Sequence, residues 1–245
     1  MKIFRPVRPP SIIIFDVDGV LVDVRGSFLK TTLETVRFFT GKRVTAAEWH
    51  RWKNRSGYND DWKLSTAWVR SLGGNFEYEE VKRKFVELYW GKDRDGNVRR
   101  ERWMLPRRSL KRLSKDYELD LFTGRNRQEL NYTLDRTGVR GFFKRVVTVE
   151  EVKLPKPDPE GLLKILDGRD PSEAIYVGDN IDDALAARSA RVRFVGILPS
   201  GGSERRQRLA RLQQADAEAI LNEVKELRTW LDQQRTKGQA KIPTR

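Results

Sequence analysis

The sequence has no cysteine and a single histidine among its 245 residues. Without cysteine, the chain cannot form disulfide bonds, use thiol catalysis, or bind zinc or iron–sulfur clusters through sulfur. The histidine, His50, lies in the tryptophan-rich stretch EWHRW. Because no second histidine is available, we do not expect a histidine-based zinc site.

Long apolar runs are also missing. The run Ile12–Phe15 stops at Asp16, far short of the roughly 20 residues that a membrane-spanning helix needs. Residues Met1–Pro10 carry basic side chains but lead into no apolar signal stretch. We therefore expect a cytoplasmic protein that does not enter a membrane. Its composition, 38% hydrophobic and 34% charged, is typical of a globular fold.

The chain carries a net charge of +14 at pH 7. A charge of this size attracts polyanions through a long-range field. Basic residues are concentrated at Arg99–Lys115 and Glu204–Arg211. Because no nucleic-acid-binding motif accompanies them, a solvated arginine-rich face is favoured over an RNA or DNA site, which stays open as an alternative. The sequence does not indicate an oligomeric state.

Short apolar runs alternate with segments of helical spacing through most of the chain. The runs are Ile12–Phe15, Leu119–Phe122, Val146–Val149, Ile175–Val177 and Val192–Ile197. The helical segments are Asn126–Thr137, Pro159–Leu166, Asp182–Ser189 and Ala217–Leu231. Continuous apolar runs are typical of strands that are buried on both faces. The pattern predicts an α/β fold with a Rossmann-like parallel sheet covered by helices on both sides.

Residues 26–104 interrupt this alternation, because they show only helical periodicity and many aromatic side chains. They follow the first strand, near the sheet edge where open α/β folds bind ligands. We expect an all-helical cap domain at 26–104 over a core formed by 1–25 and 105–232. A disordered basic tail is expected at 233–245, where apolar residues are few.

Within the expected cap, the stretch SGYNDDW (56–62) is too polar to form the interior of a helix. One interpretation is that Tyr58, Asn59 and Asp60 face the substrate and set specificity. An interhelical turn with a capping aspartate accounts for the stretch equally well. The sequence leaves both interpretations open.

Polar residues follow several of the predicted strands. They are Asp16, Asp18 and Gly19, then Thr123-Gly124-Arg125, the basic loop Lys153–Gly161, and Gly178-Asp179 with Asp182 and Asp183 just beyond. The carboxyl ends of parallel strands lie along one edge of a sheet. We therefore expect these side chains to converge although they are far apart in the sequence.

Carboxylates that converge repel each other, and they stay ionised only if positive charge lies among them. An all-oxygen set would consist of Asp16, Asp18, Asp179 and one of the pair Asp182 and Asp183. Such a set suits Mg²⁺, which keeps some of its waters and is usually shared with a phosphate group. The sequence therefore predicts phosphoryl chemistry with magnesium.

The residue types indicate roles in such a reaction. Asp16 would attack phosphorus and form an aspartyl-phosphate. Asp18, two residues on and therefore on the same side, would protonate the leaving oxygen and then activate water. Lys156 and Thr123 would take up charge on the phosphate oxygens, with Lys153 as an alternative to Lys156.

Four ordered motifs, DVDGV, FTGR, KPDP and GDNIDD, resemble those of the haloacid dehalogenase superfamily of phosphohydrolases, in the branch with a helical cap after the first motif. The resemblance implies catalytic roles for Asp16 and Asp18, and phosphate binding by Thr123, Gly124 and Lys156. It also implies that Asp16, the carbonyl of Asp18 and Asp179 bind the metal. Asp183 would bind it directly or through water. By spacing, it favours Asp183 over Asp182 for the metal. It favours Lys156 over Lys153 because Lys156 immediately precedes Pro157.

The dehalogenases that give the superfamily its name need no metal and lack an acid at the position of Asp18, so dehalogenation is not expected. We expect a Mg²⁺-dependent phosphomonoesterase that acts on a small phosphorylated metabolite. A phosphomutase of the same superfamily would use the same carboxylates. The basic segments leave open a phosphatase or binding protein that acts on nucleic acid.

Overall fold

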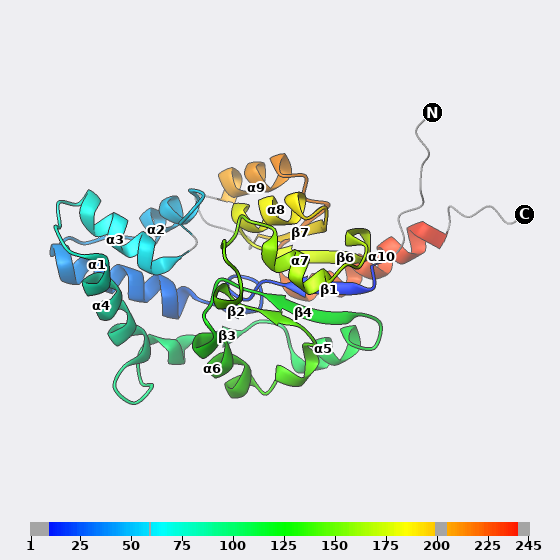
Figure 1. Cartoon of the computed structure of the whole chain (residues 1–245), viewed down its shortest axis with the longest axis horizontal. Coiled ribbons are helices and arrows are strands. Elements are labelled where there is room, and N and C mark those ends of the chain that lie inside the picture. The colour runs from blue at the N-terminus through cyan, green and yellow to red at the C-terminus, as the bar shows by residue number, and fades with distance from the viewer. Residues whose placement is uncertain (1–9, 59, 199–204, 240–245) are drawn as a thin grey trace, which may run out of the picture.

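The computed structural model describes residues 10–58, 60–198 and 205–239. Its strands are β1 (Ile12–Phe15), β2 (Val22–Asp23), β3 (Arg102–Trp103), β4 (Glu118–Phe122), β5 (Val146–Val147), β6 (Ala174–Gly178), β7 (Arg193–Ile197) and β8 (Ala219–Leu221). Its α-helices are α1 (Lys30–Thr40), α2 (Ala46–Lys53), α3 (Asp61–Ser71), α4 (Tyr78–Trp90), α5 (Arg107–Leu113), α6 (Arg127–Thr137), α7 (Glu160–Leu166), α8 (Ile181–Ser189), α9 (Arg205–Gln214) and α10 (Leu227–Gln239). In Figure 1 the sheet and the helices that flank it lie to the right, and α1, α2, α3 and α4 lie together at the left.

Six strands form one parallel sheet in the order β5-β4-β1-β6-β7-β8, which confirms the predicted α/β fold. The central strand β1 is buried along its whole length, and its side chains alternate between two hydrophobic cores. Ile13 and Phe15 pack in the core that includes side chains of α5, α6 and α10. Ile12 and Ile14 pack in the core that includes α7, α8 and α9. Helices on both faces explain why this strand is continuously apolar.

The sheet has one strand more than the sequence predicts. We expected a helix over Ala217–Leu231, but residues Ala219–Leu221 form β8, and α10 begins only at Leu227. β8 pairs with β7 in parallel, with Ala219 opposite Val195. The pairing gives the outer side of β7 a hydrogen-bonded neighbour, and this tertiary contact outweighs the local helical spacing of the residues. At the other edge, β5 ends at Val147, two residues earlier than expected.

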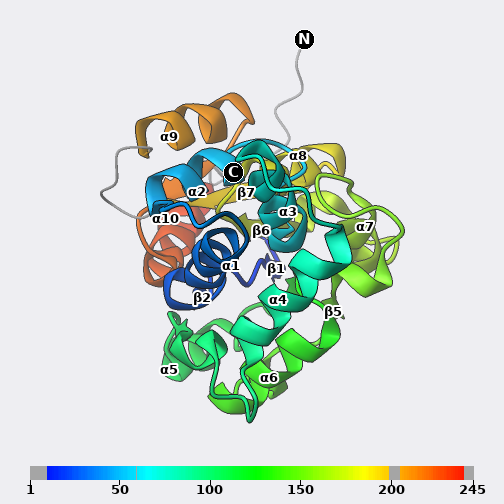
Figure 2. The ribbon, with the colours of Figure 1, turned by 90° about the vertical axis from the view of Figure 1, so that its left-hand side faces the viewer.

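Helices α1, α3 and α4 pack against one another, and α2 lies beside them. Their interior contains Trp49, Leu64 and Trp68, so many of the aromatic residues of this segment serve its own core. Figure 2 shows these helices in front of the strands, on the side where the carboxyl ends of the strands point. The division into a cap at 26–104 and a core at 1–25 and 105–232 stays a prediction.

Two segments connect the four helices to the sheet. The first runs from β1 through β2 into a turn of π-helix, Arg25–Leu29, that continues into α1. The second runs from α4 through a 3-10 turn, Asn97–Arg100, into β3. β2 and β3 pair antiparallel, with Val22 opposite Trp103, so the two connections are held side by side at the sheet edge.

The end of the chain differs from the expectation. Residues 233–239, which we expected to be disordered, are the last turns of α10, because Leu227 and Leu231 anchor this helix in the core beneath the sheet. Residues 240–245 lie outside the described residues. None of the described helices combines the length and the apolar character that a membrane crossing requires.

Candidate active site

The order of the strands brings the predicted site residues to one edge of the sheet. β1 lies between β4 and β6, with Phe15 opposite both Leu121 and Val177. The residues that follow these three strands, Asp16, Thr123 and Asp179, therefore line one cavity, together with Asp18, Gly19, Gly124 and Lys156. This convergence is what the parallel arrangement predicts.

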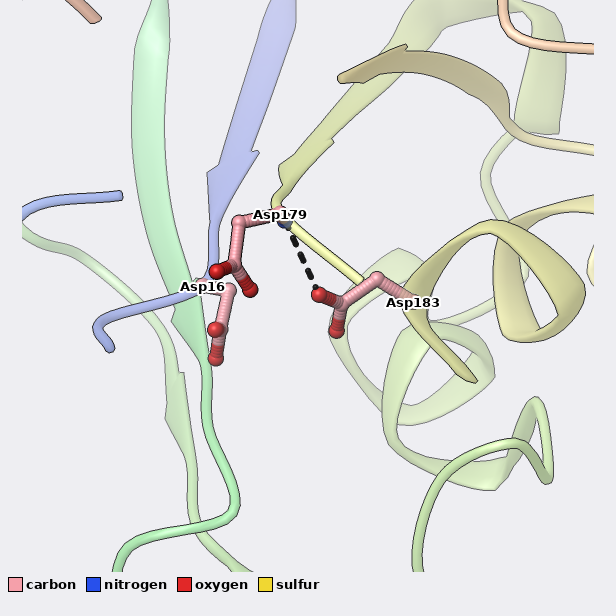
Figure 3. Close-up of side chains that lie close together, drawn as sticks. All are labelled: Asp16, Asp179 and Asp183. Carbon is pink, nitrogen blue, oxygen red and sulfur yellow. Dashed lines mark hydrogen bonds between the residues drawn. The ribbon is translucent and has the colours of Figure 1, made fainter. Parts of the chain in front are cut away.

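Three carboxylates form a cluster at the centre of this edge. Asp16, Asp179 and Asp183 each offer one oxygen, and these oxygens lie within 4.8 Å of one another (Figure 3). Asp16 follows β1, Asp179 follows β6, and Asp183 lies in the first turn of α8. Burial raises the pKa of Asp16 well above its ordinary value, and the nearby carboxylates add to the effect. Burial likewise raises the pKa of Asp179 to about 6.

Lys156 brings a positive charge into this cluster. Its Nζ lies 2.8 Å from Asp16 Oδ1, 2.7 Å from Asp183 Oδ1 and 2.7 Å from the hydroxyl of Tyr176. Burial alone would lower the pKa of Lys156, but the two carboxylates raise it above its ordinary value. Lys153, the alternative, has an exposed side chain in the same loop. The structure therefore places Lys156 beside Asp16.

Adjacent aspartates on α8 face two different parts of the molecule. Asp183 is fully buried, and its Oδ2 accepts the backbone N–H groups of Asp179 and Asn180 at 3.1 and 3.3 Å. Asp182 instead accepts the hydroxyl of Ser56 at 2.8 Å and the N–H of Gly57 at 3.3 Å. Asp183 therefore belongs to the carboxylate cluster, whereas Asp182 joins α8 to the loop after α2.

The carboxylate of Asp18 is not a member of this cluster. Its Oδ1 accepts two hydrogen bonds from Arg125, from Nε at 2.8 Å and from Nη2 at 2.6 Å. Because the resemblance assigns the carbonyl of Asp18 to the metal, that role stays a prediction. The sequence reasoning gave Arg125 no function, although it follows Thr123 and Gly124 in the motif FTGR.

Glycine is required at position 19. Gly19 has a φ of +77°, a conformation that residues with a side chain rarely adopt. A Cβ at this position would lie 2.1 Å from Asp179 Oδ2. The turn after β1 can therefore approach the carboxylate cluster only with glycine here.

The phosphate-binding candidates of the second motif lie at the end of β4. Thr123 is fully buried, and its Oγ1 accepts the N–H of Arg125 at 3.2 Å. Thr123 and Gly124 both line the cavity. Their place beside Asp16 follows from the pairing of β4 with β1.

The cavity has a volume of about 1290 Å³, and its lining includes the residues that follow the strands and residues of α2 and α3. Its wall on the helical side includes Trp49, Lys53, Asp60, Asp61 and Trp62. The volume exceeds the roughly 300–1,000 Å³ of typical ligand pockets. The cavity is therefore large enough for a phosphorylated molecule of metabolite size.

The residues proposed for substrate contact behave differently from one another. Asp60 lines the cavity, and its Oδ1 also caps α3 by accepting the N–H groups of Trp62 and Lys63. Tyr58 does not line this cavity; its ring packs 5.0 Å from that of Trp52. Asn59 lies outside the described residues.

Sequence reasoning missed an ion pair on the cavity wall. Lys53 Nζ lies 2.8 Å from Asp61 Oδ2, and the indole N–H of Trp49 donates to Asp61 Oδ1 at 3.3 Å. Asp61 belongs to the polar stretch 56–62, which was the available signal. Lys53 lies within a helix, where nothing in the sequence distinguishes it from a surface lysine.

Part of the basic segment Glu204–Arg211 contacts the site. Arg208 Nη2 donates to the carbonyl of Asp179 at 2.7 Å and to its Oδ2 at 3.2 Å. Arg211 donates to the carbonyl of Asn54 in the helical segment. These two arginines therefore bind other parts of the chain and are not simply a solvated face.

Comparison with known proteins gives a family match over most of the chain. The family described as haloacid dehalogenase-like hydrolase matches residues 13–197. A phosphonoacetaldehyde hydrolase-like protein from Oleispira antarctica has a similar structure, with a TM-score of 0.74, 17% identity and 96% of each chain covered. At this identity the likeness concerns the fold alone.

Two curated relatives carry names of phosphate-cleaving enzymes. The chain is 45% identical over 83 residues to the pyrophosphatase PpaX of Bacillus velezensis. This aligned stretch covers 33% of this chain and 38% of that protein. It is 26% identical to phosphoglycolate phosphatase 1 of Pseudomonas aeruginosa, over 79% of this chain and 71% of that protein. The chain also spans only 44% of another curated relative, to which it is 30% identical.

Proposed function

The chain belongs to the family of haloacid dehalogenase-like hydrolases, and from this premise we propose that it is a Mg²⁺-dependent phosphomonoesterase. Its substrate would be a small phosphorylated metabolite, and its intermediate an aspartyl-phosphate on Asp16. The observation that carries the proposal is the position of Asp16, buried beside Asp179, Asp183 and Lys156 on the wall of the cavity. The phosphatase and pyrophosphatase names of the curated relatives support it.

The carboxylate cluster fits a magnesium ion. All of its donors are oxygens, and the raised pKa values of Asp16 and Asp179 reflect buried like charges that a cation would compensate. Asp16, Asp179 and the carbonyl of Asp18 would hold the ion, with Asp183 as a direct or water-mediated ligand. When bound, Mg²⁺ would screen the repulsion between the attacking carboxylate and the phosphate.

The hydrogen bonds of Asp16 indicate which of its oxygens reacts. Lys156 occupies Oδ1, whereas Oδ2 accepts none of the hydrogen bonds found among the described residues. We assign Oδ2 as the atom that attacks phosphorus while the bond to the ester oxygen breaks. Thr123, Gly124 and Lys156 would bind the oxygens of the transferred group.

Asp18 completes the reaction as acid and base. It gives a proton to the departing ester oxygen in the first step. In the second step it takes a proton from the water that attacks the aspartyl-phosphate, which releases inorganic phosphate and restores the carboxylate of Asp16. The helical segment 26–104 forms the opposite wall, so we propose that it acts as a cap and selects the leaving group, with Asp60 among the contacts.

The test is hydrolysis of 4-nitrophenyl phosphate by the full chain with Mg²⁺. We expect activity that chelation abolishes and that Asp16→Asn lowers to background. Asp135→Asn is the matched control, because it makes the same change at an exposed position on α6. Activity that survives either chelation or Asp16→Asn would contradict the proposal.

A further inference from the structure

Arg125 is buried completely, although its guanidinium group carries a full positive charge. It donates to three different side chains. Nε and Nη2 donate to Asp18 Oδ1, Nη1 donates to Thr133 Oγ1 at 2.7 Å, and both Nη atoms donate to Glu101, at 3.1 and 2.8 Å. A buried cation is tolerated only when its charge and its donors are paired in this way.

Glu101 is the second buried charge of this network. Its side chain is fully buried, and it accepts Arg125 on both carboxylate oxygens, the hydroxyl of Tyr89 at 2.9 Å and that of Thr133 at 2.9 Å. Burial alone would raise the pKa of Glu101, but Arg125 and these hydroxyls hold it below its ordinary value. The carboxylate is therefore fixed by four donors and cannot turn away from Arg125 without leaving them unpaired.

Both connections to the helical segment contribute to this network. Glu101 lies in the second connection, between the 3-10 turn Asn97–Arg100 and β3. Tyr89 lies on α4, and Phe28 lies in the first connection. Their rings stack with the ring centres 4.7 Å apart. Phe28 in turn lies beneath the guanidinium of Arg125, with the ring centre 5.2 Å from Cζ. The position of the helices and the position of Arg125 are thus linked by direct contacts.

The network treats the two oxygens of Asp18 differently. Arg125 donates twice to Oδ1, whereas Oδ2 accepts none of the hydrogen bonds formed among the described residues. Asp18 lines the cavity, and its side chain is 33% exposed. Because a guanidinium group can only donate, the two donors directed at Oδ1 leave Oδ2 as the oxygen available to a molecule in the cavity.

We propose that Arg125 and Glu101 are positioning residues that hold Asp18 by Oδ1 and thereby make Oδ2 the atom that transfers the proton. This rests on the proposed function. In the first step the proton passes from Oδ2 to the ester oxygen as the bond between that oxygen and phosphorus breaks. In the second step Oδ2 takes a proton from the attacking water. Glu101 acts through Arg125 and contacts neither substrate nor phosphate.

The experiment compares two esters with the same ring, 4-nitrophenyl phosphate and phenyl phosphate. Phenol is the weaker acid, so its ester depends more on proton donation to the leaving oxygen. The quantity measured is kcat/KM, which reports steps up to the first loss of leaving group. In Glu101→Gln and in Arg125→Lys we expect kcat/KM for phenyl phosphate to fall about tenfold or more beyond the fall for 4-nitrophenyl phosphate. Arg125→Lys keeps the charge, so it decides the question if Glu101→Gln fails to fold.

Arg136→Ala is the matched control. Arg136 donates to the carbonyl of Glu101 at 2.8 Å and to that of Arg99 at 3.3 Å, so its loss disturbs the same connection without touching Asp18. We expect the ratio of the two kcat/KM values to stay unchanged in this variant. In an Asp18→Asn background, Glu101→Gln should add nothing to the ratio, because it acts through Asp18.

The outcomes separate this proposal from the proposed function. An unchanged ratio in Glu101→Gln and Arg125→Lys, or an equal change in Arg136→Ala, overturns the positioning of Asp18 and leaves the phosphatase intact. Absence of hydrolysis by the unaltered chain, or activity that survives Asp16→Asn, overturns the proposed function and this proposal with it.

Discussion

Asp120 is a buried carboxyl group whose ionisation should weaken the fold. It lies within β4, fully buried, where Oδ1 accepts the N–H of Arg145 at 2.8 Å. Among the residues that the structure describes, no donor forms a hydrogen bond to its Oδ2, and Arg169 Nη2 lies 4.0 Å from that oxygen. Burial raises the pKa of Asp120 from 3.8 to about 6. In Asp120→Asn the amide oxygen can keep the bond from Arg145 while the ionisation is removed.

The sign and size of the effect follow from linkage. Because the pKa is higher in the folded chain than in the unfolded one, the protein is most stable below pH 3.8 with respect to this group, and it loses stability as the pH rises to about 6. The difference between the folded and unfolded pKa values of Asp120 corresponds to a loss of stability of about 3 kcal/mol, at about 1.4 kcal/mol per pKa unit. We expect about 2 kcal/mol, because water near the partly exposed side chains of Arg145 and Arg169 reduces the desolvation that raises the pKa of Asp120.

The assay is urea unfolding of the unaltered chain and of Asp120→Asn between pH 4 and pH 8. The free energy of unfolding of the variant minus that of the unaltered chain should rise by about 2 kcal/mol over this interval. The subtraction removes the titration of all other groups. Asp23→Asn is the control, because hydrogen bonds from Arg25 and Arg102 lower the pKa of Asp23, so its contribution to stability changes below pH 4 and its difference should stay nearly constant over this interval. A difference for Asp120→Asn that stays constant with pH would refute the reasoning.

Three further predictions concern the site. Gly19→Ala places a Cβ 2.1 Å from Asp179 Oδ2, so the displaced carboxylate should lower kcat/KM for 4-nitrophenyl phosphate by about 100-fold; unchanged kinetics would contradict this. Ser56→Ala removes the hydrogen bond to Asp182, worth about 1 kcal/mol, and should raise KM about fivefold with kcat nearly constant; a fall in kcat alone would show that the contact does not assist binding. Magnesium should raise the melting temperature of the unaltered chain but not of Asp179→Asn, and equal shifts in both would exclude Asp179 as a ligand.

The sheet could be predicted because its central strands are buried on both faces. Ile12–Phe15 is apolar at every position, and helices pack on both of its sides. β8 could not be predicted, because Ile220, Val224, Leu227 and Leu231 follow helical spacing, and only the pairing with β7 makes Ala219–Leu221 a strand. The two-residue strands β2 and β3 are too short to leave any periodicity.

The position of the site residues along the sheet edge could likewise be predicted from strand ends. The direction in which each side chain points could not. Residue chemistry alone does not distinguish Asp182 from Asp183, and only the spacing of the family motif favours Asp183. The structure separates them, because Asp182 accepts the hydroxyl of Ser56 whereas Asp183 accepts the N–H of Asp179. Arg125 and Glu101 are two among many charged residues in the sequence, and their burial depends on the packing of two connections that are distant in the chain.

The location of Glu101 limits which helical segments could replace the present one on this sheet. Glu101 lies in the connection that leads from α4 to β3, whereas Arg125 follows β4 of the sheet. If a different helical segment replaced this one, Arg125 would be buried without its partner unless the new segment placed an acidic residue at the position of Glu101. Exchanging the helical segment would therefore require replacing Glu101 and Arg125 together, because each is the buried partner of the other.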